Sequence, residues 1–290
     1  MFSFAKNAPP PIDERDYERR VMDDYRKLLK EKCNDEKAFQ EFFEKNPSLV
    51  PGAKSNFIEN PSGHGPINLA LISQPKISGL NDKHPDFMWL SWDSSAFCPV
   101  FIEIETPGKK YFNKNKTPNA KFTQALNQLK NWQTILEQSA NRLKFYNDYC
   151  IGQDLRDSHF EPYFVLIYGR REELEKGNNL ALERKKWENR NETIMSFDRI
   201  VPQFVHKNFI TCKVKGGRYV AKCLTPTFKI GPHSDGSLCK LENLGNAVDS
   251  MSYTTNERKK FLKERIPYWL ECLKLDDNVS IKSNDWQFDE

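Results

Sequence analysis

The stretch PDFMWLSWDSSAFCPVFIEIETP, residues 85–107, decides the fold. It contains two runs rich in aromatic and β-branched residues, 86–92 and 98–105, and the turn-forming triplet 93–95 lies between them. Runs of this kind on either side of a short polar turn are typical of a β-hairpin. We therefore predict two antiparallel strands here.

The second of these strands carries carboxylates on one of its faces. Alternate side chains of a strand share a face, so Glu103 and Glu105 point to the same side, about 7 Å apart. A turn centred on residues 94 and 95 places Asp86 opposite Glu103, where cross-strand Cβ atoms lie about 5 Å apart. The pattern predicts that three acidic side chains converge, and the alternative is an ordinary solvated strand face.

The segments around the hairpin indicate an α/β protein. Asp13 is expected to cap an amphipathic helix with a charged outer face, and a second, short helix is expected to start at residue 34 or 35 and to stop at Asn46. The hairpin is followed by a helix whose apolar positions share one face, and then by a strand that ends at Gly169. The shared positions are Ala125, Leu129, Trp132 and Leu136, and the strand is 163–168.

Further patterns continue to the C-terminal end of the sequence. Residues 170–190 are expected to be helical, a short strand should precede Asp198 as a helix cap, and Gly216-Gly217 marks the turn of a second hairpin. A capping box at Thr254-x-x-Glu257 then opens a helix. We predict an N-terminal arm and helix at 1–34, a core at 35–205 and a C-terminal β-then-α appendage at 206–290.

Composition excludes some classes of protein. The chain has 290 residues with 44 Lys and Arg against 40 Asp and Glu, and a net charge of +4 is too small to argue nucleic-acid binding by itself. Seven cysteines without a CxxC pair argue against a disulfide framework and a zinc knuckle. The cysteine usage fits a reducing, cytoplasmic compartment, and because no apolar run reaches the roughly 18 residues of a membrane span, we expect a soluble protein that makes no membrane contact.

Converging carboxylates suit a hard divalent cation. Mg²⁺ is usually held by one or two carboxylates together with water and substrate phosphate. Such an ion can polarise a scissile phosphoryl group, lower the pKa of an attacking water and stabilise the leaving oxygen. We therefore expect Mg²⁺ at Asp86, Glu103 and Glu105, with Mn²⁺ able to substitute.

Several motifs, taken in order, resemble those of a known nuclease superfamily. Pro85-Asp86-Phe87, the strand that ends at Pro107, and Gln124 to Gln128 on a helix follow the motif order of the PD-(D/E)xK nucleases. More narrowly, region 35–205 resembles the nuclease domain of the Shedu anti-phage defence family. The segments that carry this narrower resemblance are 39–47, 165–170 and 196–199.

The resemblance implies a restriction-endonuclease-like mixed sheet flanked by helices, Mg²⁺-dependent cleavage of DNA and a role in bacterial defence against phage. Asp86 takes the position of the family's metal-binding Asp, and Glu103 that of the acid in the (D/E)xK element. Glu105 stands where the family pattern has Lys. Some active restriction enzymes of the superfamily carry Glu there, and Glu105 could then act as a general base or a further ligand, with Lys109 or Lys121 supplying the missing cation. The alternative is a degenerate nuclease fold kept for nucleic-acid binding or as a scaffold.

Two neighbouring segments complete the predicted site. In the superfamily a Gln on the helix after the acidic strand often lines the active site, and we prefer Gln124 to Gln128 for that role. The basic loop before this helix could track a phosphate backbone, and its Tyr111 and Phe112 could stack a base, although a plain solvated loop is the alternative. We expect DNA as a partner and self-association of the chain. The lysines of the loop are Lys109, Lys110, Lys114 and Lys116.

Overall fold

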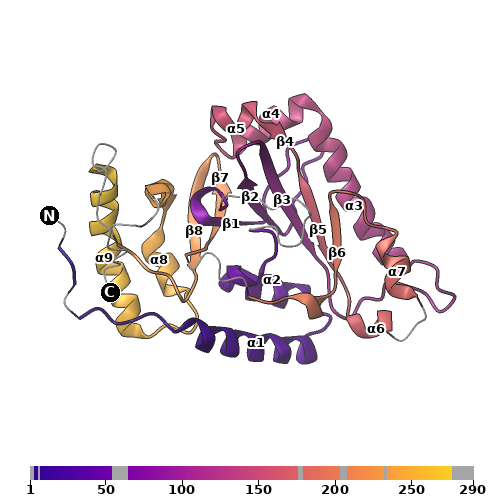
Figure 1. The fold of residues 1–290 in the computed structure, drawn as a ribbon, viewed down its shortest axis with the longest axis horizontal. Coiled ribbons are helices and arrows are strands. Elements are labelled where there is room, and N and C mark those ends of the chain that lie inside the picture. Colours follow the sequence, from indigo (N-terminus) through magenta and orange to yellow (C-terminus); the bar gives the residue numbers. More distant parts are fainter. Residues whose placement is uncertain are drawn as a thin grey trace.

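A mixed β-sheet forms the centre of the protein in this computed structural model, which describes residues 3–5, 7–53, 65–175, 179–202, 208–231, 234 and 236–275. Within these residues the sheet has nine strands in the order β6-β5-β3-β2-β1-β7-β8-β9, with β4 paired to β3 (Figure 1). Neighbouring strands are antiparallel at β1–β2, β2–β3 and β7–β8 and parallel at the other pairings. The strands are β1 (Ala70–Ser73), β2 (Phe87–Trp92), β3 (Ala96–Ile104), β4 (His159–Phe160), β5 (Tyr163–Ile167), β6 (Glu192–Met195), β7 (Ile210–Lys215), β8 (Arg218–Leu224) and β9 (Leu241–Glu242). The predicted α/β fold with a mixed sheet is confirmed.

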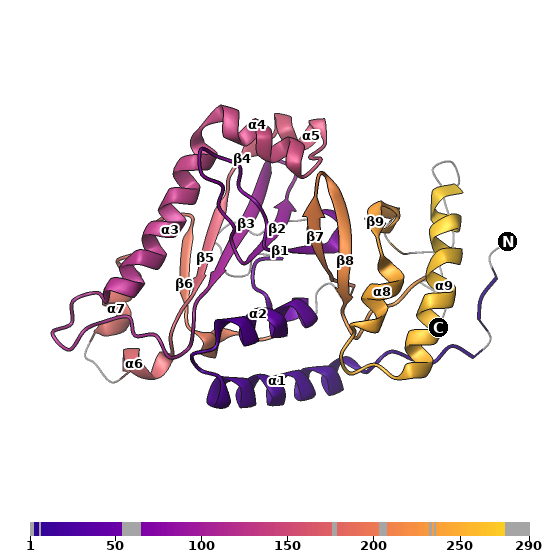
Figure 2. The same cartoon turned by 180° about the vertical axis from the view of Figure 1, so that it is seen from behind.

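Helices cover both faces of the central strands (Figures 1 and 2). One core contains residues of α1 and α2 together with Phe87 and Ile102, and the opposite core contains residues of α3 and α4 together with Met88 and Phe101. The strand faces around the hairpin are therefore both buried. The helices are α1 (Glu14–Glu31), α2 (Glu36–Lys45), α3 (Ala120–Glu137), α4 (Ser139–Asp148), α5 (Gln153–Asp157), α6 (Arg171–Glu175), α7 (Leu180–Lys185), α8 (Leu244–Asp249) and α9 (Asn256–Leu275).

The hairpin forms in the predicted register. Phe87 pairs with Ile102 and Met88 with Phe101, so Asp86, one residue before β2, faces Glu103. The turn is held by Asp93, whose Oδ1 accepts hydrogen bonds from the backbone N–H groups of Ser95 and Ala96 at 2.7 and 2.8 Å. The polar triplet thus fixes the register that brings the two acids together.

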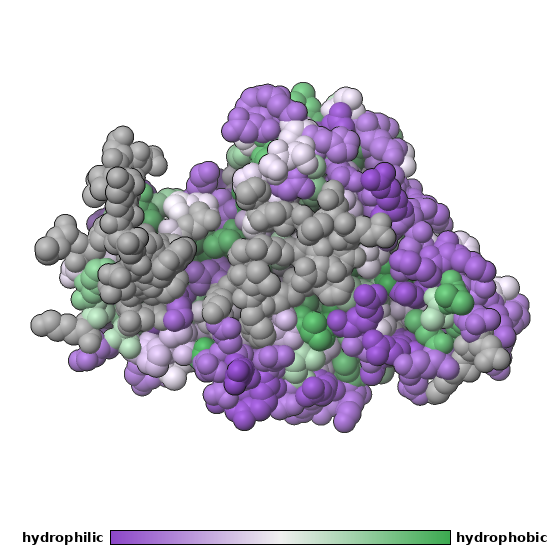
Figure 3. Space-filling model, in the orientation of Figure 1, coloured by the Kyte–Doolittle hydropathy of each residue, from purple (hydrophilic) through white to green (hydrophobic). Residues whose placement is uncertain are grey.

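The first two helices begin as their capping residues predict. The Asp13 side chain accepts from Arg15 N and Asp16 N at the start of α1, and that of Asp35 accepts from Ala38 N at the start of α2. Hydrophilic side chains dominate the outer surface over α1, as expected for its charged face (Figure 3). Both helices therefore bury their apolar faces in the same core, where Tyr25 of α1 contacts Phe39 and Phe43 of α2, and α1 leaves its charged face to solvent.

Two expected helix caps are wrong in detail. The Asp198 carboxylate does not cap a following helix; it accepts from Arg170 Nε at 2.8 Å and from the backbone N–H of Arg171 at 2.6 Å. At the start of α9 the backbone N–H of Arg258 is bound by Thr255 Oγ1 at 3.2 Å, one residue later than the expected capping threonine, Thr254. At α9 the motif identified the right region, but the hydroxyls of the adjacent residues Thr254 and Thr255 compete to cap the helix.

The C-terminal β-then-α part continues the sheet of the core. β7 pairs with β1 in parallel, and the hairpin of β7 and β8 turns at Gly216 and Gly217 as predicted. The predicted boundary near residue 205 lies outside the described residues. No helix within the described part of the chain is both long enough and apolar enough to cross a membrane.

Gly169 fixes the loop that follows the acidic strand. It has φ +58°, and a Cβ at this position would lie 2.8 Å from Lys109 O and 2.9 Å from Tyr111 Cε2. The Tyr111 hydroxyl in turn donates to the carbonyl of Tyr168. Only a glycine allows the loop to approach the end of β5 this closely.

We predict that Gly169→Ala lowers the free energy of unfolding by about 1–3 kcal/mol, because the new methyl group meets backbone and the residue must keep a left-handed conformation. Thermal unfolding followed by circular dichroism measures this effect. Gly236→Ala is the matched control, since a Cβ there meets no atom within 4 Å. Equal melting temperatures for the two variants would contradict the assigned role of Gly169.

Candidate active site

Two carboxylates meet where β2 begins and β3 ends. Asp86 Oδ2 accepts the backbone N–H of Ile104 at 2.7 Å, which fixes the Asp86 side chain across the hairpin. Glu103 is only 8% exposed. The interpretation of this strand face as ordinary solvated surface is therefore wrong, because helix α3 covers it.

One oxygen of Glu103 has a partner and the other does not. Gln128 of α3 donates from Nε2 to Glu103 Oε1 at 2.6 Å. Among the described residues, Glu103 Oε2 is buried and no N–H or hydroxyl donates to it, while the Asp86 carboxyl lies within hydrogen-bonding reach of Glu103 when one of the two is protonated. A buried, unsatisfied carboxylate oxygen is costly, so this atom calls for a proton or a cation.

The acidities of the pair reflect this burial. The pKa of Asp86 is raised to about 7, mainly by burial; the hydrogen bond from Ile104 opposes the shift and the nearby charge of Glu36 adds to it. The pKa of Glu103 is raised well above its usual value, first by burial and then by the charges of Asp86 and Glu36. Each ionised carboxylate disfavours ionisation of the other, and a cation between them would relieve both costs.

Glu105 is held by a lysine rather than by the acidic pair. Its carboxylate forms an ion pair with Lys109 Nζ, which also lies 3.9 Å from Glu36 Oε2. Burial is the largest cause that lowers the pKa of Lys109, and the negative charges of Glu36, Glu103 and Asp86 act against it. Of the two lysines considered as a substitute for the motif lysine, Lys109 is thus the one in contact with the acids. Lys121 is exposed in the first turn of α3.

The arrangement fits a divalent cation held by two carboxylates. Among the described residues no group of three His, Cys, Asp or Glu side chains is arranged to hold a metal, so the expected convergence of all three acids is not found. Asp86 and Glu103 nonetheless offer oxygen donors, including the unpartnered Oε2, and this is the donor type that Mg²⁺ prefers. Glu105 as a metal ligand stays a prediction.

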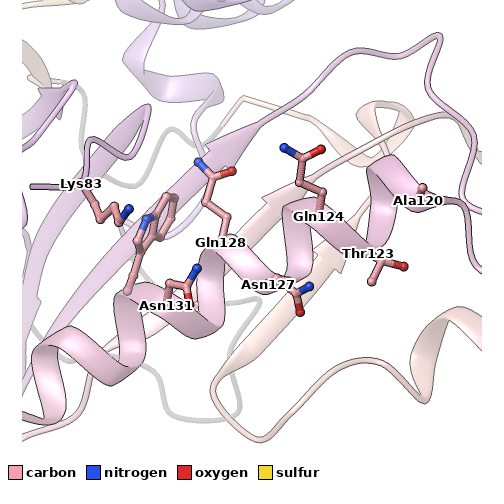
Figure 4. Close-up of a pocket in the computed structure, with 8 residues that line it drawn as sticks. Lys83, Ala120, Thr123, Gln124, Asn127, Gln128 and Asn131 are labelled. Atoms are coloured by element: carbon pink, nitrogen blue, oxygen red, sulfur yellow. The ribbon is translucent and has the colours of Figure 1, made fainter. Parts of the chain in front are cut away.

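A polar hollow of about 580 Å³ runs along α3, and Gln128, which contacts Glu103, is among its lining residues (Figure 4). Gln124 and Gln128 point to the same side of the helix, with Thr123 and Asn127 on the other. It is Gln128 that contacts Glu103, whereas Gln124, the preferred glutamine, is exposed and lines the hollow. Helical spacing alone could not separate the two, because they share a face.

Helix α2 contributes residues that sequence reasoning left out. Gln40 Nε2 lies 3.4 Å from both the backbone oxygen of Asp86 and Ser73 Oγ. Glu44, one turn later, accepts from Ser73 Oγ and pairs with Lys222 Nζ of β8 at 2.7 Å. The spacing of Gln40 and Glu44 was a usable signal, because polar residues four apart on a Phe-rich helix share a face.

The basic loop is anchored by its aromatic residues. Tyr111 and Phe112 are buried in the core of the α3 face, so the expectation that they stack a base is wrong. Their backbone N–H groups both donate to the carboxylate of Glu173, each at 3.0 Å. The lysines expected to bind nucleic acid divide accordingly: Lys109 lies in the acidic site, while Lys110, Lys114 and Lys116 are exposed.

Comparisons with known proteins agree with this region of the chain. A family model described as Shedu protein SduA, C-terminal, matches residues 33–201, which is more than half of the chain and close to the predicted span of 35–205. A comparison with curated proteins gave no match. The matched residues include the acidic pair, Lys109 and the helix that carries Gln128.

We predict that Asp86→Asn and Glu103→Gln each raise the melting temperature at pH 8 in EDTA by a few degrees, as about 1 kcal/mol does in a protein of this size. Each amide removes a charge that burial opposes and keeps an oxygen to accept the existing hydrogen bond. The folded pKa of Asp86, about 7, exceeds its unfolded value, so the folded state binds more protons between about pH 4 and 7. Wild-type stability should therefore fall as pH rises through this window.

Thermal scans at pH 5 and pH 8 check this prediction. The advantage of the amide variants should shrink at pH 5, where the wild-type pair holds a proton. Glu137→Gln, on the exposed end of α3, is the control and should leave the melting temperature unchanged. Amide variants that melt below the wild type at pH 8 would show that the buried charges stabilise the fold.

Proposed function

This chain belongs to the Shedu SduA family, which points to anti-phage defence, and we propose that it is a divalent-cation-dependent endonuclease that cleaves DNA. The observation that carries the proposal is the buried pair of Asp86 and Glu103 with its unpartnered oxygen. A purely structural strand has no use for two carboxylates whose ionisation is so strongly opposed. Mg²⁺ is the proposed cofactor, with Mn²⁺ as a substitute.

The residues of the site divide the work of phosphodiester hydrolysis. A bound Mg²⁺ would supply Lewis-acid polarisation of the phosphoryl group and a water of lowered pKa. Asp86 and Glu103 would hold the ion, each fixed in place beforehand by a hydrogen bond, from Ile104 N and from Gln128 respectively. Such prior fixation reduces the reorganisation that the reaction would otherwise require.

Lys109 supplies the positive charge that the family motif places at position 105. Its ammonium pairs with the carboxylate of Glu105 and interacts electrostatically with both Asp86 and Glu103. An ammonium in this position can stabilise the charge that develops on the phosphoryl oxygens. Glu105 orients Lys109 and is the candidate base for the attacking water.

DNA would reach the site over the exposed lysines of the loop and the polar hollow along α3. Lys110, Lys114 and Lys116 lie on the solvent side of a loop whose other side is anchored in the core. Lysines on a fixed loop can follow a phosphate backbone without reading its sequence. The amides of Gln124 and Asn127 in the hollow offer both hydrogen-bond donors and acceptors to a nucleotide. Self-association of the chain stays a prediction.

The second candidate is a degenerate nuclease fold that binds nucleic acid without cutting it. The replacement of the motif lysine by Glu105 favours this candidate, and so does the ion pair that neutralises Lys109. Both candidates predict DNA binding. They differ in whether the bound strand is hydrolysed and whether the acidic pair is needed for binding.

We predict that Asp86→Asn and Glu103→Gln each slow DNA cleavage by at least about 100-fold while remaining folded, since each loses the charge that holds the cation. The assay is nicking and linearisation of supercoiled plasmid with Mg²⁺, Mn²⁺ or EDTA. In parallel, Mn²⁺ should raise the melting temperature of the wild type by mass action and have less effect on either variant.

Two outcomes would refute parts of this assignment. Cleavage by either variant at the wild-type rate would remove the acidic pair from the site. A wild-type protein that binds DNA but leaves it uncut with every metal would favour the degenerate fold. Glu137→Gln again serves as the control, as an exposed carboxylate remote from the pair in sequence.

We predict that Lys109→Gln slows cleavage by about 100-fold, the usual loss when a group that stabilises transition-state charge is removed. The exchange Glu105→Lys with Lys109→Glu keeps an ion pair and returns a lysine to the motif position, so it should recover at least tenfold over Lys109→Gln. Initial rates of plasmid nicking in Mg²⁺ measure both effects.

Lys130→Gln is the control for the loss of one lysine, because Lys130 is exposed on α3 and lies outside the acidic site. If Lys109→Gln cuts as fast as Lys130→Gln, Lys109 has no part in the reaction. A charge-exchanged protein that is no faster than Lys109→Gln would show that the lysine must stand at position 109.

A further inference from the structure

A second hollow lies at the end of β3 opposite to the acidic pair. It has a volume of about 420 Å³ and is formed by α4, α5 and β4, with Arg142, Arg156, Ser139 and Ser158 among its lining residues. β4 pairs with the start of β3 through Ala96 and His159. Glu103 is seven residues further along that strand, which corresponds to about 23 Å.

Two arginines lie over aromatic rings that line this hollow. The Arg142 guanidinium carbon is 5.5 Å from the Phe160 ring centre, and that of Arg156 is 5.7 Å from the Tyr146 ring centre. The two rings contact each other edge to face with centres 5.8 Å apart. Both guanidiniums therefore lie beside one pair of rings. Burial raises the pKa of the Tyr146 hydroxyl, and the charges of Arg142 and Arg156 oppose this shift.

The guanidiniums keep most of their donors available. Arg156 uses Nε to bind Ile151 O at 2.7 Å, which leaves its terminal nitrogens, and within the described residues neither Arg142 nor Arg156 pairs with a carboxylate. No Asp or Glu is among the described residues that line the hollow. Two half-buried positive charges therefore share a concave site to which the described part of the chain contributes no counter-ion.

We propose that this hollow is a binding site for the phosphate group of a small phosphorylated molecule. Guanidinium groups that stack on aromatic faces present their N–H edges sideways, and those edges match the oxygens of a phosphate. The Ser139 hydroxyl at the start of α4 adds a further donor. The volume is in the range of small-ligand pockets and suits a mononucleotide.

The proposed site is separate from the acidic pair. A small ligand here is too far from Asp86 and Glu103 to take part in the chemistry there, and the hollow has cationic donors where the acidic pair offers only oxygen acceptors. The proposal therefore does not rest on the nuclease function. It holds or fails in the absence of DNA and divalent cations.

The test is isothermal titration calorimetry of the full chain in EDTA at constant ionic strength, with inorganic phosphate, adenosine 5′-monophosphate and adenosine as ligands. We expect inorganic phosphate and the monophosphate to bind and adenosine not to bind. Arg142→Gln and Arg156→Gln should each weaken the binding at least about tenfold, the loss expected for a charge-assisted hydrogen bond. Arg19→Gln on α1, an exposed arginine of the opposite sheet face, is the matched control and should bind as the wild type does.

Arg142→Lys and Arg156→Lys keep the positive charge and remove the planar fork, so weaker binding by these variants tests the proposed geometry even if a glutamine variant unfolds. Circular dichroism without ligand shows which variants remain folded. Three results would overturn the proposal: no heat of binding for either phosphate ligand at millimolar concentration, adenosine binding as tightly as its monophosphate, or unchanged affinity in the folded variants of both arginines.

Discussion

Asp86 and Glu103 face each other across β2 and β3 inside a sheet that is covered on both sides. The surrounding structure must compensate for the burial of these two carboxylates. Burial is the main cause that raises the pKa of both carboxyls, and the charge of Asp86 raises that of Glu103 further. The fold compensates with one backbone N–H for Asp86 and one amide of α3 for Glu103. Within the described residues, one buried oxygen of Glu103 receives no hydrogen bond from an N–H or a hydroxyl. The buried carboxylates therefore lower the stability of the fold, which is the usual cost of a functional site.

The elements around the pair are placed by a small number of close contacts. Gly169 lets the loop after β3 cross the end of β5, and Tyr111 fastens that loop to Tyr168. The loop then turns Lys109 back toward Glu105. A longer loop would lose more conformational entropy when it placed Lys109 beside Glu105. The position of the Lys109 ammonium therefore depends on the backbone geometry of this loop and not on the alternating pattern of the strand.

The hairpin, its register and the facing acids could be predicted because the strand period is two and the polar triplet at residues 93–95 fixes the centre of the turn. The caps of α1 and α2 could also be predicted, because each capping side chain binds N–H groups only two or three residues further along the chain. What could not be predicted depended on contacts between distant segments: the inward direction of Tyr111, for which the prediction was wrong, the contact of Gln128 with Glu103, and the lysine that β8 brings to Glu44. No periodicity encodes these, since each is decided by which surface packs against the residue.

The sheet does not end where the family match ends. The match stops at residue 201, yet β7 follows it and pairs with β1, which carries Ser73 beside the acidic site, and β8 pairs with β7. A fragment cut at the family boundary would leave β1 with a row of open backbone donors and acceptors, the kind of edge that invites pairing with other chains. A recombinant fragment should therefore extend beyond the residues that match the family, and low solubility of a fragment limited to residues 33–201 would reflect a bare sheet edge rather than a misfolded site.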